Sequence, residues 1–226
     1  MELSRDEIKN ENIRKTAKKL TDMMTSEEKI YQTLNSTPPI ERLGINGYDW
    51  WNEGLHGVAR AGLATVFPQA IGLAATWDET LAEQVADAVS TEARAKYNMQ
   101  QRMDDTGRYK GLTLWAPNIN IFRDPRWGRG HETYGEDPYL TSRMGIRFIE
   151  GLQGHDENYL KSAACVKHFA VHSGPEGLRH EFNAVVSKKD MYDTYLPAFK
   201  ACIQEAHVEA VMGAYNRTND EPCCGS

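Results

Sequence analysis

A lysine and a histidine stand side by side near the end of an apolar segment of strand length. The segment runs from Ala163 to Phe169, and Lys167 and His168 are its polar members. Burying charged or polar side chains without partners is costly, and such groups gather at functional sites. The pair therefore indicates a binding or catalytic site. The alternative is a structural pair whose hydrogen bonds are satisfied inside the fold.

Two other segments place charged side chains among tryptophan and glycine residues. Glu53 follows two tryptophans, and Arg126 and Arg129 flank Trp127. Carboxylates and guanidinium groups form strong hydrogen bonds to polar ligands, and we favour Arg129 for ligand contact and Arg126 for structure. As structural alternatives, Glu53 could pair with Arg60, and one of the two arginines could hold the loop through a carboxylate. The nearby carboxylates are those of Glu132, Glu136 and Asp137.

The composition limits the classes of function. The 226 residues carry a formal net charge of -6, without a basic stripe of the kind that binds nucleic acid. No segment approaches the roughly 18 apolar residues of a membrane span, and the first residues lack the apolar part of a signal peptide. The sequence therefore predicts a cytoplasmic protein with neither nucleic acid nor membrane as a partner. Because no Cys-x-x-Cys or His-Glu-x-x-His pattern occurs, we expect no metal and no cofactor.

Helix start signals occur at several places along the chain. Apolar residues at helical spacing from 13 to 24 predict an N-terminal helix, and Thr25 with Glu28 has the capping-box form that starts a second one. The N-caps predicted for later helices are Asp78, Asp137 with Pro138 after it, and Ser187, and Pro197 should kink the last helix.

Short apolar segments lie between these helices. The clearest are 112–116, 163–169 and 210–215, with weaker candidates at 47–50 and 65–68. Strands that alternate with helices form parallel sheets, and their polar ends meet at the carboxyl edge. The polar residues that end these segments should therefore lie close together. The residues expected in the core include Cys165, Cys202, Trp77 and Trp115.

Five segments together carry a resemblance to a known family. They are WWNEGLHG, TVFPQAIGLAATWD, APNINIFRDPRWGRGHETYGEDP, AACVKHF and VMGAYN, in this order between Leu43 and Cys224. This combination resembles the N-terminal catalytic domain of glycoside hydrolase family 3. The resemblance implies an α/β fold, namely a partial (β/α)8 TIM-type barrel with about five strands, preceded by N-terminal helices. It divides the chain into a helical lead-in at 1–40 and a partial barrel domain at 41–226.

The resemblance also implies roles for particular residues. Glu53 would accept hydrogen bonds from hydroxyl groups of a terminal sugar, and Tyr215 matches a tyrosine that lies near the nucleophile. The implied donors to the same sugar are Arg129, Lys167, His168 and Arg179. The flat apolar faces of Trp50, Trp51 and Trp127 suit the C–H side of a sugar ring.

A retaining glycosidase needs two carboxyl groups about 5 to 5.5 Å apart. The sequence has no residues at the positions that the resemblance gives to this pair. The resemblance places the nucleophilic aspartate on the strand after the one that ends in Tyr215, and the acid/base glutamate further away. Both are therefore expected beyond Ser226. Asp49 and Asp124 do not occupy the nucleophile's position. We expect no catalytic residue in this chain and an inactive fragment of a larger enzyme, with an unpaired strand edge before Tyr215.

The implied activity is hydrolysis of terminal non-reducing β-linked sugars with retention of configuration. The segment with glutamate at position 53 resembles that of the β-xylosidases. The longer side chain of glutamate would fill space that the hydroxymethyl group of a hexose needs. We therefore predict a β-D-xylosidase acting on xylo-oligosaccharides, with a β-glucosidase of the same family as the alternative. The full-length enzyme could form a homo-oligomer.

Two further alternatives belong to other classes of protein. Lys167 could form a Schiff base with a carbonyl substrate, although the sequence shows no apolar pocket that would lower its pKa. Borohydride trapping would detect that chemistry. A non-catalytic sugar-binding or assembly protein would keep the polar residues without the carboxyl pair, and it would bind sugar without hydrolysis.

Overall fold

The computed structural model describes the chain from Arg5 to Gly225, with side chains from Glu11 onward. The first four residues of the predicted helical lead-in, and Ser226, lie outside this part. The helices are α1 (Arg5–Met23), α2 (Ser26–Tyr31), α3 (Ala70–Ala74), α4 (Glu79–Arg102), α5 (Pro138–Gln153), α6 (Lys188–Asp190) and α7 (Pro197–Gln204). The strands are β1 (Ser36–Thr37), β2 (Tyr48–Asp49), β3 (Thr113–Leu114), β4 (Ala163–Phe169), β5 (Asn183–Ala184), β6 (Ala210–Gly213), β7 (Arg217–Thr218) and β8 (Glu221–Pro222). Short 3-10 turns lie at Glu41–Leu43, Gly130–Glu132 and Glu176–Leu178, and a π-helical turn lies at Met191–Tyr195.

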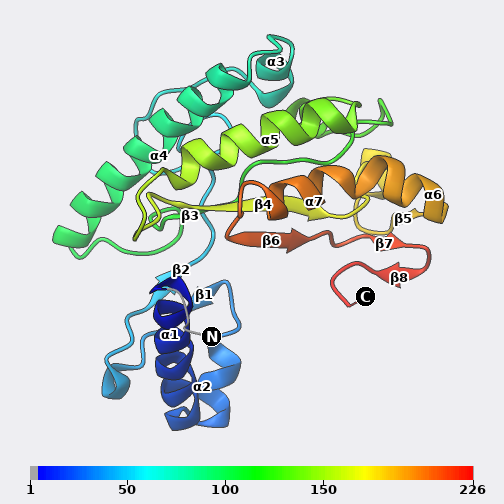
Figure 1. The fold of residues 1–226 in the computed structure, drawn as a ribbon. Coiled ribbons are helices and arrows are strands. Elements are labelled where there is room, and N and C mark those ends of the chain that lie inside the picture. Colours follow the sequence, from blue (N-terminus) through cyan, green and yellow to red (C-terminus); the bar gives the residue numbers. More distant parts are fainter. Residues whose placement is uncertain (1–4, 226) are drawn as a thin grey trace.

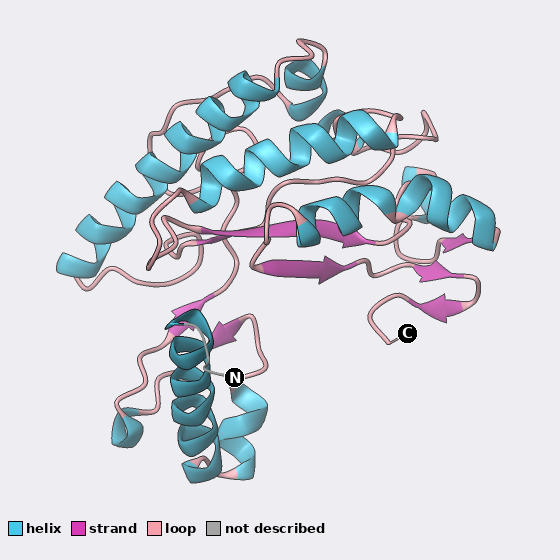
Figure 2. Ribbon diagram, in the orientation of Figure 1, coloured by secondary structure: helices cyan, strands magenta, loops and turns pink. Residues whose placement is uncertain are grey.

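A parallel sheet of β3, β4 and β6 lies at the centre of the fold, with β4 in the middle. The long helices α4 and α5 lie side by side over the sheet, and α5 and α7 contact β4 (Figure 1). The alternation of strands with helices predicted this parallel arrangement. A second, smaller sheet contains β5, β7 and β8, and helices α1 and α2 lie away from the parallel sheet (Figure 2). Strands β1 and β2 lie between them (Figure 2), and the Tyr48 hydroxyl of β2 is bonded to Thr113 of β3.

Of the about five barrel strands that were predicted, the central sheet contains three in the described part of the chain, and Asn52 forms one further parallel bridge to Leu114 of β3. Segment 47–50 contributes β2, which pairs antiparallel with β1 instead. Segment 65–68 forms no strand, because the Thr65 backbone and hydroxyl both bond to Glu92 and Pro68 has no backbone N–H to donate. The barrel is not closed, and β6 lies at the edge of the sheet with Val211 44% exposed.

The predicted helix starts are confirmed. Thr25 and Glu28 form a reciprocal capping box at the start of α2. The side chains of Asp78 and Asp137 accept hydrogen bonds from backbone N–H groups in the first turns of α4 and α5. Pro197 interrupts the helix that Ser187 caps, since α6 passes into the π-helical turn and α7 begins at the proline. Each signal acts within one turn, so the rest of the fold has little influence on it.

The core lies between the sheet and its helices. Its largest fully buried side chains include Phe148, Phe199, Leu114, Ile119 and Val166. The cysteines at 165 and 202 are buried there, as predicted. Trp77 is not, because it follows α3 at a positive φ of 57° and its side chain is 75% exposed. No helix between Arg5 and Gly225 has the length and apolar content that crossing a bilayer requires.

Candidate functional site

The strand β4 delivers Lys167 and His168 to the carboxyl edge of the sheet. Both residues are buried, with 5% and 3% exposure. The register between β4 and β6 shifts between Lys167 and Phe169. Such an irregularity sets two residues of one strand against one residue of its neighbour, so the usual alternation of side chains is broken here. The shift explains how adjacent polar side chains can both face the same group, the guanidinium of Arg129.

The ammonium group of Lys167 forms no hydrogen bond or ion pair within the described part of the chain. Burial, together with the nearby charge of Arg129, lowers the pKa of Lys167 to about 8, while Glu132 and Glu53 oppose this shift. The expectation that this lysine lacks an environment able to lower its pKa is therefore wrong. Neighbouring residues in the sequence could not show it, because the burial comes from packing between distant elements. Lys167 offers three N–H donors that the protein does not occupy.

His168 is held in one orientation by Asn120. The Asn120 amide nitrogen donates to the backbone oxygens of His168 and Ala170, so its Oδ1 atom is the acceptor for both the backbone N–H and Nδ1–H of His168. The other ring nitrogen, Nε2, then carries a lone pair and lies 3.3 Å from Arg129 Nη1. Burial and the charges of Lys167 and Arg129 hold the pKa of His168 far below its usual range. His168 therefore presents an acceptor, in contrast to the donor role that the resemblance implies.

Sequence reasoning missed Asn120. The signal for it is the alternation of Asn118 and Asn120 around a buried isoleucine after β3, which is typical of an extended segment that turns one face towards a polar site. Asn118 is fully buried, and its Oδ1 atom accepts the backbone N–H of Asn120. Its amide nitrogen has no partner in the described residues.

Arg129 begins the 3-10 turn after the β3 loop and forms a two-pronged ion pair with Glu132. Its Nε and Nη2 atoms each lie 2.6 Å from a carboxylate oxygen. Burial opposes the charged form, but the ion pair outweighs it and raises the pKa of Arg129 above its usual value. Arg129 therefore braces the loop, the role that the sequence left open for one of the two arginines, and it also faces His168; its contact with a ligand stays a prediction. Arg126 instead pairs with Asp124, whose pKa it lowers to about 2.

Glu53 lies in the segment that follows β2, and its carboxylate is partly exposed. The indole N–H of Trp51 donates to Oε1 at 3.1 Å, and Oε2 lies 3.6 Å from Arg60 Nε. The pairing with Arg60 that the sequence left open is therefore present, although it is long for a hydrogen bond. Trp51 stacks on Trp115 with the ring centroids 5.0 Å apart. The charge of Glu53 acts on Lys167, so the two groups face a common region.

Tyr215 follows β6 and is held by the loop between β4 and β5. Arg179 Nε donates to its hydroxyl at 2.6 Å, and His180 stacks on its ring. His172 meets the same ring edge to face, with centroids 5.1 Å apart. Trp127, which was expected to offer a flat face, is only 4% exposed because it packs against Phe122 and His172. No group of three or more His, Cys, Asp or Glu side chains between Glu11 and Gly225 is arranged to hold a metal ion.

The two buried histidines should make the fold acid-sensitive between pH 6.5 and pH 5. Burial also lowers the pKa of His172 to about 4, so unfolded chains bind more protons than folded chains in this range. Stability is therefore fully present above pH 6.5 and is lost as the pH falls. At pH 5 we expect a loss of about 2 kcal/mol for each histidine.

Urea denaturation at pH 7 and pH 5 measures this loss. His172→Phe should remove about half of the difference between the two pH values. An unfolding free energy that is unchanged between pH 7 and pH 5 in the wild-type chain would contradict the expectation.

Comparison with known proteins places these residues in a family. A sequence profile of the "Glycosyl hydrolase family 3 N terminal domain" matches residues 48–226. The chain belongs to glycosyl hydrolase family 3. A xylan 1,4-beta-xylosidase of Xylanibacter ruminicola is 50% identical over 223 residues, which cover 96% of this chain and 26% of that protein.

Solved glycosidase structures share the fold. An exo-beta-xylosidase in complex with a xylobiose aziridine probe has a TM-score of 0.81 and 36% identity, covering 91% of this chain and 27% of that one. The beta-glucosidase DesR of Streptomyces venezuelae, in complex with D-glucose, has a TM-score of 0.74 and 29% identity, covering 92% of this chain and 25% of that one. The chain therefore spans about a quarter of the length of these relatives.

The structure of this family 3 chain brings the predicted site residues together in two groups. The first contains Arg129, Lys167 and His168, with Glu53 acting on it through its charge. The second contains Arg179 and Tyr215, joined by a hydrogen bond. His172 links the groups, because its ring lies 4.7 Å from that of His168 and also contacts Tyr215. Asp49 accepts the backbone N–H of Trp51 and so has a local structural partner.

Proposed function

We propose that this chain supplies the sugar-recognition part of a glycosidase that removes terminal β-linked sugars with retention of configuration. The observation that carries the proposal is the cluster of Lys167, His168 and Arg129 at the carboxyl edge of the parallel sheet. Lys167 has N–H donors that no described residue occupies, and Asn120 fixes the His168 ring so that the Nε2 lone pair faces Arg129 Nη1. Adjacent hydroxyl groups of a pyranose need directed partners of both kinds, and charged hydrogen bonds are worth about 1.5 to 3 kcal/mol each.

Several features support a site for sugar hydroxyls over a Schiff-base site. The lowered pKa of Lys167 leaves a larger fraction of neutral amine at pH 7 than an ordinary lysine has, so this alternative gains from the structure. However, Arg129 and His168 lie beside the amine, and the carboxylates of Glu132 and Glu53 act on it. This arrangement suits several hydroxyl groups better than one carbonyl. Borohydride reduction in the presence of a carbonyl sugar should leave Lys167 unmodified.

We propose a xylo-oligosaccharide as the substrate. Glu53 carries this choice, because its longer side chain would fill the space beside the C5 carbon of the sugar. The relatives named as xylosidases support it. A β-glucosidase is the second candidate, because solved β-glucosidases share the fold over most of this chain.

The bond-breaking carboxyl pair is proposed to belong to residues outside this chain. Glu132 is engaged by Arg129, and Asp124 is engaged by Arg126. A retaining site needs a nucleophile and an acid/base about 5 to 5.5 Å apart. A non-catalytic sugar-binding protein would have the same recognition cluster without that pair. The division at residue 40, the cytoplasmic location and a homo-oligomeric enzyme stay predictions.

The test is to express the 226-residue chain and a version extended by any coding sequence that follows it. Both are assayed on aryl β-xyloside and aryl β-glucoside, and xylose binding is measured by calorimetry. We expect hydrolysis by the extended protein with xyloside preferred, and sugar binding without hydrolysis by the 226-residue chain. Hydrolysis by the shorter chain would contradict the assignment of the carboxyl pair.

Shortening Glu53 should change the sugar preference. In Glu53→Asp, the carboxylate withdraws by one methylene, which opens space for a hydroxymethyl group. One methylene in a pocket is worth about 10- to 200-fold in selectivity, so we expect the ratio of glucoside to xyloside kcat/KM to rise at least about tenfold. Glu53→Gln is the matched control, because it keeps the length and should lower both activities together. An unchanged ratio in Glu53→Asp would remove Glu53 as the determinant.

A further inference from the structure

His172, in the loop after β4, has a buried ring nitrogen without a partner. The residue is 4% exposed. Its Nε2 atom has no hydrogen bond to any described residue, whereas its Nδ1 atom lies 3.0 Å from Asn216 Oδ1. Buried polar atoms are nearly always satisfied, by the protein or by an ordered water molecule.

The surroundings of Asn216 determine which nitrogen of His172 carries the proton. The Asn216 amide nitrogen donates to the backbone oxygens of Val171 and Arg217, each at 2.8 Å. Its Oδ1 atom is therefore free to accept, so His172 donates from Nδ1–H. Burial keeps the ring neutral, with its pKa lowered to about 4. The unpartnered Nε2 atom is thus an acceptor that needs a donor.

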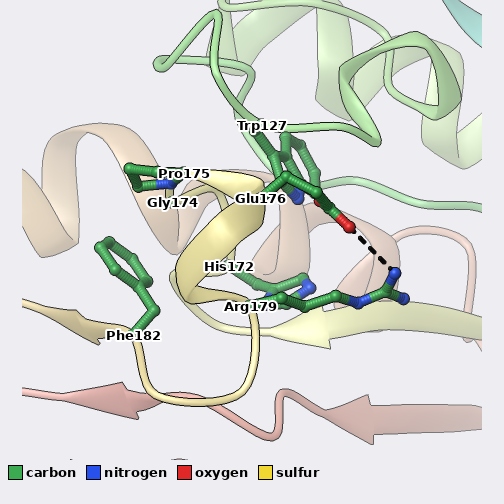
Figure 3. Close-up of a pocket in the computed structure, with 7 residues that line it drawn as sticks. All are labelled: Trp127, His172, Gly174, Pro175, Glu176, Arg179 and Phe182. Carbon is green, nitrogen blue, oxygen red and sulfur yellow. Dashed lines mark hydrogen bonds and ion pairs between the residues drawn. The ribbon is translucent and has the colours of Figure 1, made fainter.

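A small pocket lies beside this nitrogen. His172 lines it together with Trp127, Glu176 and Arg179, and the last two form an ion pair across it (Figure 3). The space open to the centre of a water-sized sphere is about 10 Å³, close to the roughly 10–15 Å³ that one water molecule requires. The pocket is too small for a sugar. It is polar, and Glu176 and Arg179 are available as further partners for a water molecule.

The same loop holds Tyr215. Arg179 donates to the tyrosine hydroxyl, His172 contacts the tyrosine ring, and Asn216, which His172 binds, is the next residue in the chain. We propose that His172 is a positioning residue for Tyr215, an inference that rests on the function proposed above. His172 acts through Asn216 on one side and through a single fixed water molecule bound to Nε2 on the other. The water joins His172 to the 174–179 loop, and the bond to Asn216 joins His172 to the chain after β6. Tyr215, not His172, touches the sugar.

Two substitutions test the roles of Nδ1 and Nε2 of His172 separately. His172→Asn keeps a donor at the Nδ1 position and removes Nε2, and His172→Gln keeps an acceptor near the Nε2 position and removes the donor. Crystals of the extended protein should show one water molecule at this place in wild type and in His172→Gln, and none in His172→Asn. In both variants we expect kcat to fall about tenfold or more, because small misplacements are costly, with KM changed less than about twofold. His155→Gln, at an exposed histidine bonded to Glu83, is the control and should match wild type.

Two structural results would overturn the proposal irrespective of activity. One is a wild-type structure with no water within hydrogen-bonding distance of Nε2, and the other is a nitrogen NMR signal that shows the proton on Nε2. Unchanged kcat in both variants, with Tyr215 undisplaced, would also overturn it. If the extended protein proves inactive, the proposed function fails, while the water molecule and the position of the Tyr215 ring in the two variants still decide the role of His172.

Discussion

Replacing Lys167 by methionine should stabilise the fold at neutral pH and weaken sugar binding. Folding lowers the pKa of this lysine from 10.5 to about 8. Below pH 8 the lysine is protonated in both the folded and the unfolded state, and burying its charge then lowers the unfolding free energy by about 3 kcal/mol. The cost declines between pH 8 and 10.5, because the folded lysine loses its proton first. Methionine has a similar length and carries no charge. We therefore expect an unfolding free energy about 3 kcal/mol higher at pH 7, with a smaller gain near pH 10.

The same substitution removes a charged donor from the proposed sugar site. A charged hydrogen bond is worth about 1.5 to 3 kcal/mol, which corresponds to about 10- to 100-fold in affinity for xylose. Urea denaturation at pH 7 and pH 10 measures the first effect, and calorimetry measures the second. Lys167→Arg is the matched control, because it retains the charge and should show no gain in stability. A methionine variant that is less stable at pH 7 would show that the ammonium has a stabilising partner.

Removing the charge of Glu132 should destabilise the fold strongly. Glu132→Gln would leave the Arg129 guanidinium buried, with Lys167 near it and no counter-charge bonded to it. Breaking a buried ion pair from one side costs about 3 to 5 kcal/mol, and because these two side chains keep 16% and 15% exposure we expect a loss near the lower end of that range. The exposed pair between Lys189 and Asp193 offers a contrast, because Asp193→Asn should cost less than about 1 kcal/mol.

A double variant separates the effect of charge from the effect of loop packing. Removing both charges, in Arg129→Gln with Glu132→Gln, should recover most of the stability that the single variant loses, because the guanidinium charge that Glu132 compensates is removed with it. Urea denaturation of the four proteins, namely wild type, the two single variants and the double variant, gives the coupling energy. A double variant as unstable as Glu132→Gln would mean that loop packing, and not charge, is responsible.

The helix starts were predictable because their causes are local. Thr25, Asp78 and Asp137 each satisfy backbone N–H groups within three residues. Segment 65–68 was not predictable from local pattern, because its apolar residues resemble a strand, while Glu92 on α4 holds Thr65 through long-range hydrogen bonds.

The proposed site was predictable in its residues but not in its chemistry. Lys167 and His168 stand out by type in an apolar segment. Their states depend on burial, on Arg129 and on Asn120, and both residues lie more than thirty positions away in the sequence. Neither the lowered pKa of the lysine nor the acceptor role of the histidine could therefore be deduced beforehand. The expected flat face of Trp127 failed for the same reason, because contacts with Phe122 and His172 bury it.

The open edge of β6 has a consequence for protein engineering. The backbone of this edge is free to pair with a further strand, whereas the residues proposed to recognise the sugar all lie between Glu53 and Tyr215. A crossover after Asn216 would keep the proposed recognition residues and the His172–Asn216 bond together, and we expect it to exchange the proposed bond-breaking residues of one family member for those of another. Chimeras joined at this point could combine the sugar preference of one parent with the leaving-group range or pH range of the other.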